Sequence, residues 1–196
     1  MNQKKKRTLR QLMLGAMLMG LGIVIPIVMP AKIVIGPASF TLASHVPVMA
    51  AMFFSPYLTV FVALGTAIGF LLAIPVATIW LRALTHLVSM GIGAFVLAKM
   101  PDLVNKRVKF QIFNLLLGIF HAALEVLVVW IFYAVGMAPL EPQALLGLLL
   151  LIGFGGIIQS MIDFNLAFML CKFLSKMVNI EIFARAKAKL TMNLAE

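Results

Sequence analysis

His121 and Glu125 lie four residues apart in the apolar stretch FHAALEVLVVW, which spans residues 120 to 130. On a helix this spacing places both side chains on one face. An imidazole beside a carboxylate can transfer a proton, hold a metal ion or bind a polar solute. If the helix lies in a bilayer, both groups are costly there, so they indicate a function.

Two further pairs repeat this spacing. Arg82 and His86 form one pair, and Gln159 and Asp163 form the other. A charge at mid-bilayer costs about 2.5 to 3.5 kcal/mol on insertion scales, so such residues pair with one another or line a cavity. One interpretation is a structural network in which Arg82 pairs with Glu125 or Asp163. Three polar faces together favour a chamber for a hydrophilic solute.

The polar chamber is expected to open to the outside of the membrane. At 1.5 Å per residue, Arg82 lies roughly 10 Å and Glu125 roughly 16 Å below the outer ends of their helices. The expected roof consists of the loops 31–44, 73–76 and 136–143. His45 at the start of a helix, together with the permanently charged Arg82, favours an anionic group in the chamber.

Three aromatic residues are expected in the outer part of the chamber. They are Trp80, Trp130 and Tyr133. Their rings could sandwich a flat solute. For Trp130 and Tyr133 an interfacial aromatic belt is an equally good interpretation.

The composition requires lipid as the solvent. Of the 196 residues, 63% are hydrophobic and 11% charged, and the mean hydropathy is +1.11. A soluble domain carries roughly 25% charged residues, and the apolar runs do not alternate as in a membrane β-barrel. The net charge of +10 comes from basic clusters that flank apolar runs. Such clusters are typical of cytoplasmic helix ends that contact lipid head groups. No aromatic residues are interleaved with them, which argues against nucleic-acid binding.

The sequence predicts an all-α membrane protein with one domain, 1–196, and six transmembrane helices. Both termini are expected in the cytoplasm, and the protein in the cell membrane of a bacterium. Prolines and basic clusters mark the ends of the helices. The predicted helices span residues 10–29, 45–54, 57–73, 76–98, 109–136 and 144–176, and the loop 31–44 forms an external cap.

Small residues recur at four-residue spacing in two predicted helices. Ala16 and Gly20 lie on the first, and Gly65 and Gly69 on the third. Such pairs allow helices to approach closely. They serve either internal packing or contact with another membrane subunit. The second interpretation suits the first helix better, because terminal helices often lie at the edge of a bundle.

Several segments resemble the S components of energy-coupling factor (ECF) vitamin transporters. The basic start leading into LGAMLMGLG, the segment SHVPVMAAMFFSP (44–56) and the polar fifth and sixth helices carry this resemblance. It implies an S-component-like bundle that binds a water-soluble vitamin and docks through Ala16 and Gly20 on a transmembrane T component. The family's second small residue is commonly alanine, where this chain has glycine. Two cytosolic ATPases of this ABC-type importer would use ATP, because the chain has no GxxxxGK[ST] motif.

The segments 30–48, RALTHLV (82–88) and IIQSMIDF (157–164) look most like the nicotinate-specific members. The resemblance implies that Arg82 or a histidine holds the carboxylate of nicotinate. A protonated His121, paired with Glu125, would donate to the ring nitrogen. No metal ion and no cofactor are expected in this chain. The predicted substrate-binding residues are His45, Trp80, Arg82, His86, His121, Glu125, Trp130, Tyr133, Gln159 and Asp163.

Other functions stay open at this point. The vitamin could be pantothenate, pyridoxine, thiamine or a queuosine precursor. A stand-alone secondary transporter would use Glu125 or Asp163 as its proton carrier, and a purely structural subunit would need neither. An intramembrane enzyme would use His121 and Glu125 as an acid–base pair, or hold a metal with Asp163. We expect no enzyme, because the chain has no HExxH or GxSxG motif.

Overall fold

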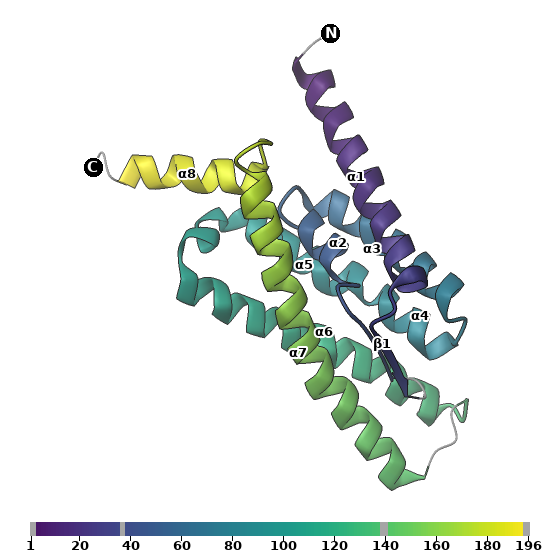
Figure 1. Cartoon of the computed structure of the whole chain (residues 1–196). Coiled ribbons are helices and arrows are strands. Elements are labelled where there is room, and N and C mark those ends of the chain that lie inside the picture. The colour runs from purple at the N-terminus through teal and green to yellow at the C-terminus, as the bar shows by residue number, and fades with distance from the viewer. Residues whose placement is uncertain (1–2, 36–37, 138–140, 194–196) are drawn as a thin grey trace.

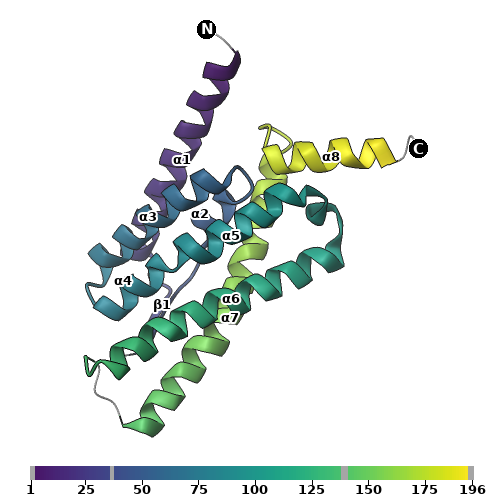
Figure 2. The same ribbon diagram turned by 180° about the vertical axis from the view of Figure 1, so that it is seen from behind.

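The computed structural model describes residues 3–35, 38–137 and 141–193, and helices dominate this part of the chain (Figures 1 and 2). One small hairpin of two antiparallel strands interrupts the helices. In chain order the elements are α1 (Gln3–Val28), β1 (Lys32–Ile35), β2 (Ala38–Thr41), α2 (Val46–Ala51), α3 (Pro56–Ala73), α4 (Ala77–Leu84), α5 (His86–Lys99), the 3-10 helix η1 (Pro101–Asn105), α6 (Arg107–Ala134), α7 (Pro142–Leu174) and α8 (Glu181–Asn193).

Five helical segments among the described residues are long and apolar enough to cross a bilayer. They are α1, α3, α4 with α5, α6 and α7, which agrees with the predicted class of all-α membrane protein. The predicted second membrane helix, 45–54, is helical only over six residues. Six residues of helix span about 9 Å, far less than the bilayer core. The sixth crossing therefore stays a prediction.

The segment from the hairpin to the end of α2 runs alongside α7 in the same direction. The Gln159 side chain donates a hydrogen bond to the Thr41 carbonyl, over 2.8 Å. Further along, the amide of Ile182 donates to the Phe53 carbonyl, over 3.4 Å. Thr41 thus contacts the middle of α7, while Phe53 contacts the start of α8. The hairpin consequently reaches into the middle of the bundle.

The β-hairpin is an inserted plug and not only the external roof that the sequence predicts for 31–44. Ala38 is fully buried, in one apolar cluster with Val129 and Ile152. The Phe40 ring lies so close to Gly155 of α7 that a Cβ there would be 2.7 Å from its Cζ atom. Residues 36–37 of this cap and 138–140 of the predicted loop 136–143 lie outside the described residues.

Helix α1 lies at the edge of the bundle and packs mainly against α3 (Figure 1). Gly69 of α3 permits this close approach. A Cβ at Gly69 would lie 2.6 Å from Ile23 Cα and 2.8 Å from the Gly22 carbonyl oxygen, both of them α1 backbone. Ala16 is exposed on another face of α1, and Gly20 has open space around it. Gly69 therefore serves internal packing, whereas Ala16 and Gly20 do not.

We expect Gly69→Ala to destabilise the protein by about 1–3 kcal/mol, because the new methyl group collides with backbone that cannot rotate away. Gly20→Ala is the matched control and should be neutral or slightly stabilising, since alanine is the better helix former. Thermal unfolding in detergent measures both. Equal melting temperatures for the two variants would contradict this packing.

Helix α8 is docked on the 3-10 helix η1. The Asn105 side chain donates to the Ala186 carbonyl over 3.1 Å. Asp102 accepts hydrogen bonds from Lys189 and from Lys106, each over 3.2 Å. These two ammonium groups hold the pKa of Asp102 below its usual value of 3.8. The sequence left the order of this tail undecided; the contacts show an ordered helix.

The lowered pKa of Asp102 means that its stabilising contribution is present at neutral pH and is lost as the pH falls below about 4. Asp102→Asn should accelerate amide hydrogen exchange in α8 by up to about fivefold at pH 7, since exposed pairs contribute about 1 kcal/mol or less. Glu141→Gln, which changes an exposed carboxyl group before α7, should leave α8 unchanged. Identical exchange in both variants would show that the Asp102 contacts do not hold α8.

Candidate functional site

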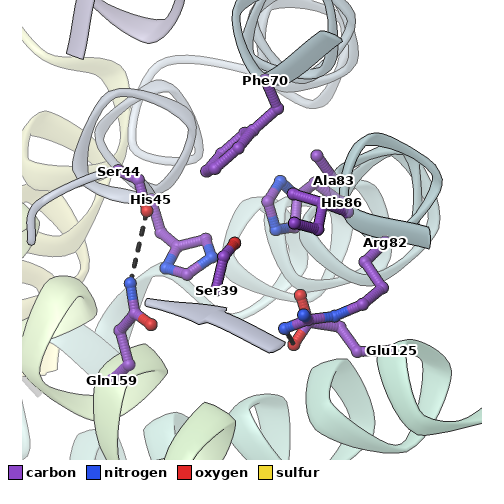
Figure 3. A pocket seen from close by; sticks show the side chains of 10 residues that line it. Ser39, Ser44, His45, Phe70, Arg82, Ala83, His86, Glu125 and Gln159 are labelled. Carbon is purple, nitrogen blue, oxygen red and sulfur yellow. Dashed lines mark hydrogen bonds and ion pairs between the residues drawn. The ribbon is translucent and has the colours of Figure 1, made fainter. Parts of the chain in front are cut away.

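A small cavity lies where the hairpin, the start of α2 and helices α3 to α7 meet (Figure 3). It measures about 10 Å³, roughly the space that one water molecule needs. The site is therefore closed in this conformation. Its lining residues are Ser39, Ser44, His45, Phe70, Ile79, Arg82, Ala83, His86, Glu125 and Gln159.

Arg82 of α4 and Glu125 of α6 form a buried ion pair at the cavity wall. The distance from Arg82 Nη2 to Glu125 Oε2 is 2.9 Å. Both residues are about 95% buried. The predicted pairing of Arg82 with Glu125 or Asp163 is thus made with Glu125. A buried charge that loses its partner costs several kcal/mol, so each residue holds the other in place.

Asp163 of α7 instead holds His45, the residue before α2. Asp163 Oδ2 accepts one hydrogen bond from His45 Nδ1, over 2.9 Å, and a second from the His45 backbone amide, over 3.2 Å. An ionised carboxylate can only accept, so the proton of this imidazole lies on Nδ1. The other ring nitrogen, Nε2, keeps its lone pair or takes a proton.

The three histidines of the chain come together from the residue before α2, from α5 and from α6. Their ring centroids are 4.8 to 5.2 Å apart. His86 is 1% exposed, and neither of its ring nitrogens has a hydrogen-bond partner in the described part of the chain. His121 Nδ1 lies 3.4 Å from Ser89 Oγ. The cluster thus presents buried imidazole nitrogens that no protein group uses.

The predicted pairing of His121 with Glu125 is weak. His121 Nε2 lies 3.7 Å from Glu125 Oε1, which is too long for a hydrogen bond. Glu125 makes its short contact with Arg82 instead. The expectation that Glu125 orients His121 therefore needs correction: in this conformation the carboxylate orients Arg82.

A break at Thr85 separates Arg82 and His86, which the sequence places on one continuous helix over 76–98. Helix α4 ends at Leu84 and α5 begins at His86. The Thr85 hydroxyl donates to the Arg82 carbonyl over 2.7 Å, and a hydroxyl that bonds nearby backbone competes with helical hydrogen bonding. The predicted helix over 76–98 is thus interrupted by a one-residue turn, but Thr85 keeps helical backbone angles and Ala77–Lys99 still forms one candidate membrane span. Both side chains line the cavity.

The predicted aromatic residues are absent from the cavity lining. Trp130 is 50% exposed, as an interfacial residue would be, and Tyr133 is half-buried. Trp80 does not line the cavity but packs against the apolar cluster of α3 and α4 to which Phe70 and Ile79 of the cavity wall belong. Phe70 of α3 supplies the aromatic wall instead. Phe70 lies in a uniformly apolar run, so no pattern in the sequence distinguishes it.

Gln159 of α7 lies at the cavity and holds the segment that closes it. Its amide nitrogen donates to the Thr41 carbonyl over 2.8 Å and to Ser44 Oγ over 3.3 Å (Figure 3). Ser39 and Ser44, which the sequence analysis did not select, complete this side. The cavity is therefore closed by hydrogen bonds that can open without disrupting the helices.

The charges of the site suit a small polar ligand. Arg82 is positive, and Glu125 and Asp163 are negative, so with neutral imidazoles the net charge is −1. Asp163 Oδ1 and Ser160 Oγ are buried without hydrogen-bond partners among the described residues. Buried polar atoms of this kind are costly unless a ligand or water satisfies them. Apolar Phe70 and Ile79 on the other side would accept a ring.

Comparison with known proteins gave one informative match. No family model and no solved structure matches the chain. The niacin transporter NiaX of Lactococcus lactis subsp. cremoris (strain MG1363) is 62% identical over 187 residues, which cover 95% of this chain and 84% of that protein. Identity at this level over nearly the whole chain shows common membership, and the resemblance found in the sequence is confirmed. The chain belongs to the family of the niacin transporter NiaX.

Proposed function

We propose that the protein is the S component of an ECF-type importer and binds nicotinate from outside the cell. The observation that carries this proposal is the closed cavity where Arg82, His45, His86 and an aromatic ring meet, in a close relative of a niacin transporter. Nicotinate is a flat ring with one carboxylate. Arg82 would bind the carboxylate, Phe70 would pack on the ring, and a histidine would contact the ring nitrogen.

Entry of nicotinate would require the hairpin to move. A cavity of about 10 Å³ cannot hold a six-membered ring. The hairpin is held against α7 by the Gln159 hydrogen bonds and the packing of Phe40 on Gly155. Outward movement of β1 and β2 would open the cavity toward the end of the bundle at which they enter it. The structure then corresponds to the closed conformation.

The delivery partners follow from the same assignment. The protein would span a bacterial cell membrane six times, with residues 45–54 as the short second crossing and both termini inside. A transmembrane T component would dock on Ala16 and Gly20, and two cytosolic ATPases would supply the energy from ATP. Basic residues beside η1 and on α8, such as Lys106 and Lys189, would contact anionic lipid at the inner surface.

Calorimetric titration of the purified protein tests the substrate. We expect nicotinate to bind at least about fivefold more tightly than nicotinamide, because a hydrogen bond to a charged group contributes about 1 kcal/mol more than one between neutral groups. Pantothenate, pyridoxine and thiamine are the controls. Tight binding of one of these controls without nicotinate binding would reassign the vitamin.

Uptake into proteoliposomes separates the proposed importer from a stand-alone transporter. The chain alone should bind nicotinate without accumulating it. Adding the T component, both ATPases and ATP should start uptake. Accumulation by the chain alone in response to a pH gradient would instead support a proton-coupled secondary transporter.

A further inference from the structure

We propose that His45, His86, His121 and Glu125 form a binding site for one divalent transition-metal ion, of which Zn²⁺ is the best fit. One donor atom from each of the four residues lies within 4.8 Å of the other three, and all four residues are buried. Three imidazole nitrogens and one carboxylate oxygen form a donor set that zinc commonly takes. The sequence does not predict this site, because it shows His121 and Glu125 four residues apart but not that His45 and His86 lie beside them.

The distances require only a small contraction. Tetrahedral zinc with bonds of 2.0–2.1 Å places its donor atoms about 3.3 Å apart. The present separations exceed this by up to about 1.5 Å. The imidazole rings meet edge to face or tilted, at 38° to 85°, so that rotation about their side-chain bonds can turn nitrogens toward one centre. His86 has no hydrogen bond to break in doing so.

Two of the three histidines, and Glu125, already have outer contacts of the kind that metal ligands make. Metal-binding histidines generally give their second ring nitrogen to a carboxylate or hydroxyl group, and binding carboxylates are themselves hydrogen-bonded. His45 Nδ1 contacts Asp163, which leaves Nε2 for the metal. His121 Nδ1 lies beside Ser89. Glu125 uses Oε2 for Arg82 and turns Oε1 toward His121.

Charge supports the same assignment. With neutral imidazoles, the site carries a net charge of −1 from Arg82, Glu125 and Asp163. A divalent cation changes this to +1, which then favours an anion. This consequence rests on the proposed function: bound metal would strengthen binding of the nicotinate carboxylate. Binding of the metal itself does not depend on the vitamin.

The decisive experiment is titration of the chelator-stripped, tag-free protein with Zn²⁺ and, separately, Co²⁺. The tag must be removed because the chain has three histidines and all belong to the cluster. We expect one ion per chain and the intense visible absorption of four-coordinate Co²⁺. His86→Gln should weaken binding by at least tenfold, which matches the usual loss for a ligand contact. His121→Gln is the second variant, in case the first does not fold.

Cys171→Ser is the matched control. It removes the one thiol of the chain, which is buried and lies near the Ala50 carbonyl, away from the histidines. The control should bind the metal as the unmodified protein does. The proposal would be overturned if the unmodified protein did not bind the metal stoichiometrically. It would also be overturned if both histidine variants bound the metal as tightly as the unmodified protein. Nicotinate binding that persists without metal would leave the proposed function standing while removing its dependence on the ion.

Discussion

Replacing Arg82 with glutamine should lower nicotinate affinity by at least about thirtyfold, because the carboxylate would lose its one permanently charged partner in the cavity. Removing one member of a buried charge pair costs about 2 to 5 kcal/mol in binding. The affinity for nicotinamide, which has no carboxylate, should change by less than about threefold. Calorimetric titration of both ligands measures the difference.

The measurement needs a background in which the variant folds. Arg82→Gln alone leaves Glu125 buried without the partner that it contacts at 2.9 Å, which destabilises a protein by about 3–5 kcal/mol. The informative comparison is therefore between Glu125→Gln and the double variant Arg82→Gln/Glu125→Gln. When both proteins are stripped of metal with a chelator, the first variant keeps the guanidinium and lacks its competing carboxylate, so it should bind nicotinate at least as tightly as the unmodified protein. The second should lose binding. Equal affinity in the two variants would show that Arg82 does not hold the carboxylate.

The same comparison bears on stability. Each single replacement leaves one buried charge, while the double variant leaves none. The double variant should therefore unfold at a higher temperature than Arg82→Gln. This would establish that the pair is held together by mutual compensation of its charges.

Most of the fold was predictable because a segment that crosses lipid must form its own backbone hydrogen bonds, which requires a helix in each long apolar run. Hydropathy and prolines placed the long helices within a few residues, such as Pro56–Ala73 for the predicted 57–73. The hairpin was harder. β1 (KIVI) is largely exposed although most of its residues are apolar, whereas β2 carries the buried Ala38 and Thr41, so hydropathy does not show which strand is inserted. The break at Thr85 depends on one hydroxyl, which periodicity does not reveal.

The charged part of the site was predictable for a different reason. Charged and imidazole groups are costly inside a membrane, so Arg82, Glu125 and His121 are conspicuous in the sequence. Their pairing was not predictable, because helical spacing shows only contacts within one helix. It favoured His121 with Glu125, whereas the tertiary packing of α4 on α6 gives Glu125 to Arg82. Phe70 was missed because its neighbours are equally apolar.

The hydrogen bonds of Gln159 and Asp163 join the segment that closes the cavity to helix α7. Residues 38–45 carry the plug, two serines and His45, and they bind α7 through Gln159 and Asp163. A ligand that reaches Arg82 must displace the plug, and its return would bring His45 back beside the ligand. Closure and recognition would then use one segment, and the ligand would be retained by the same hydrogen bonds that now close the cavity.

Tryptophan at Ala16 or Gly20 should reduce energised uptake of nicotinate by at least tenfold while leaving binding by the isolated protein unchanged. Helix α1 has 17% of its apolar window buried, against 50% for α3. Its small residues leave a flat strip at the edge of the bundle, where another membrane helix can approach closely. An indole group there would hold the T component away. The cavity lies on other helices, so nicotinate binding should not respond.

Leu72→Trp is the control for this prediction. Leu72 is 65% exposed on α3, so the change adds the same ring to a lipid-facing position outside the small-residue strip. Uptake by this variant should match that of the unmodified protein, measured in proteoliposomes with the T component, both ATPases and ATP. Full uptake with Gly20→Trp would place the docking surface elsewhere. An equal loss of uptake in all three tryptophan variants would indicate a general effect of a bulky side chain in the membrane. A specific docking surface on α1 would instead leave the α3 variant active.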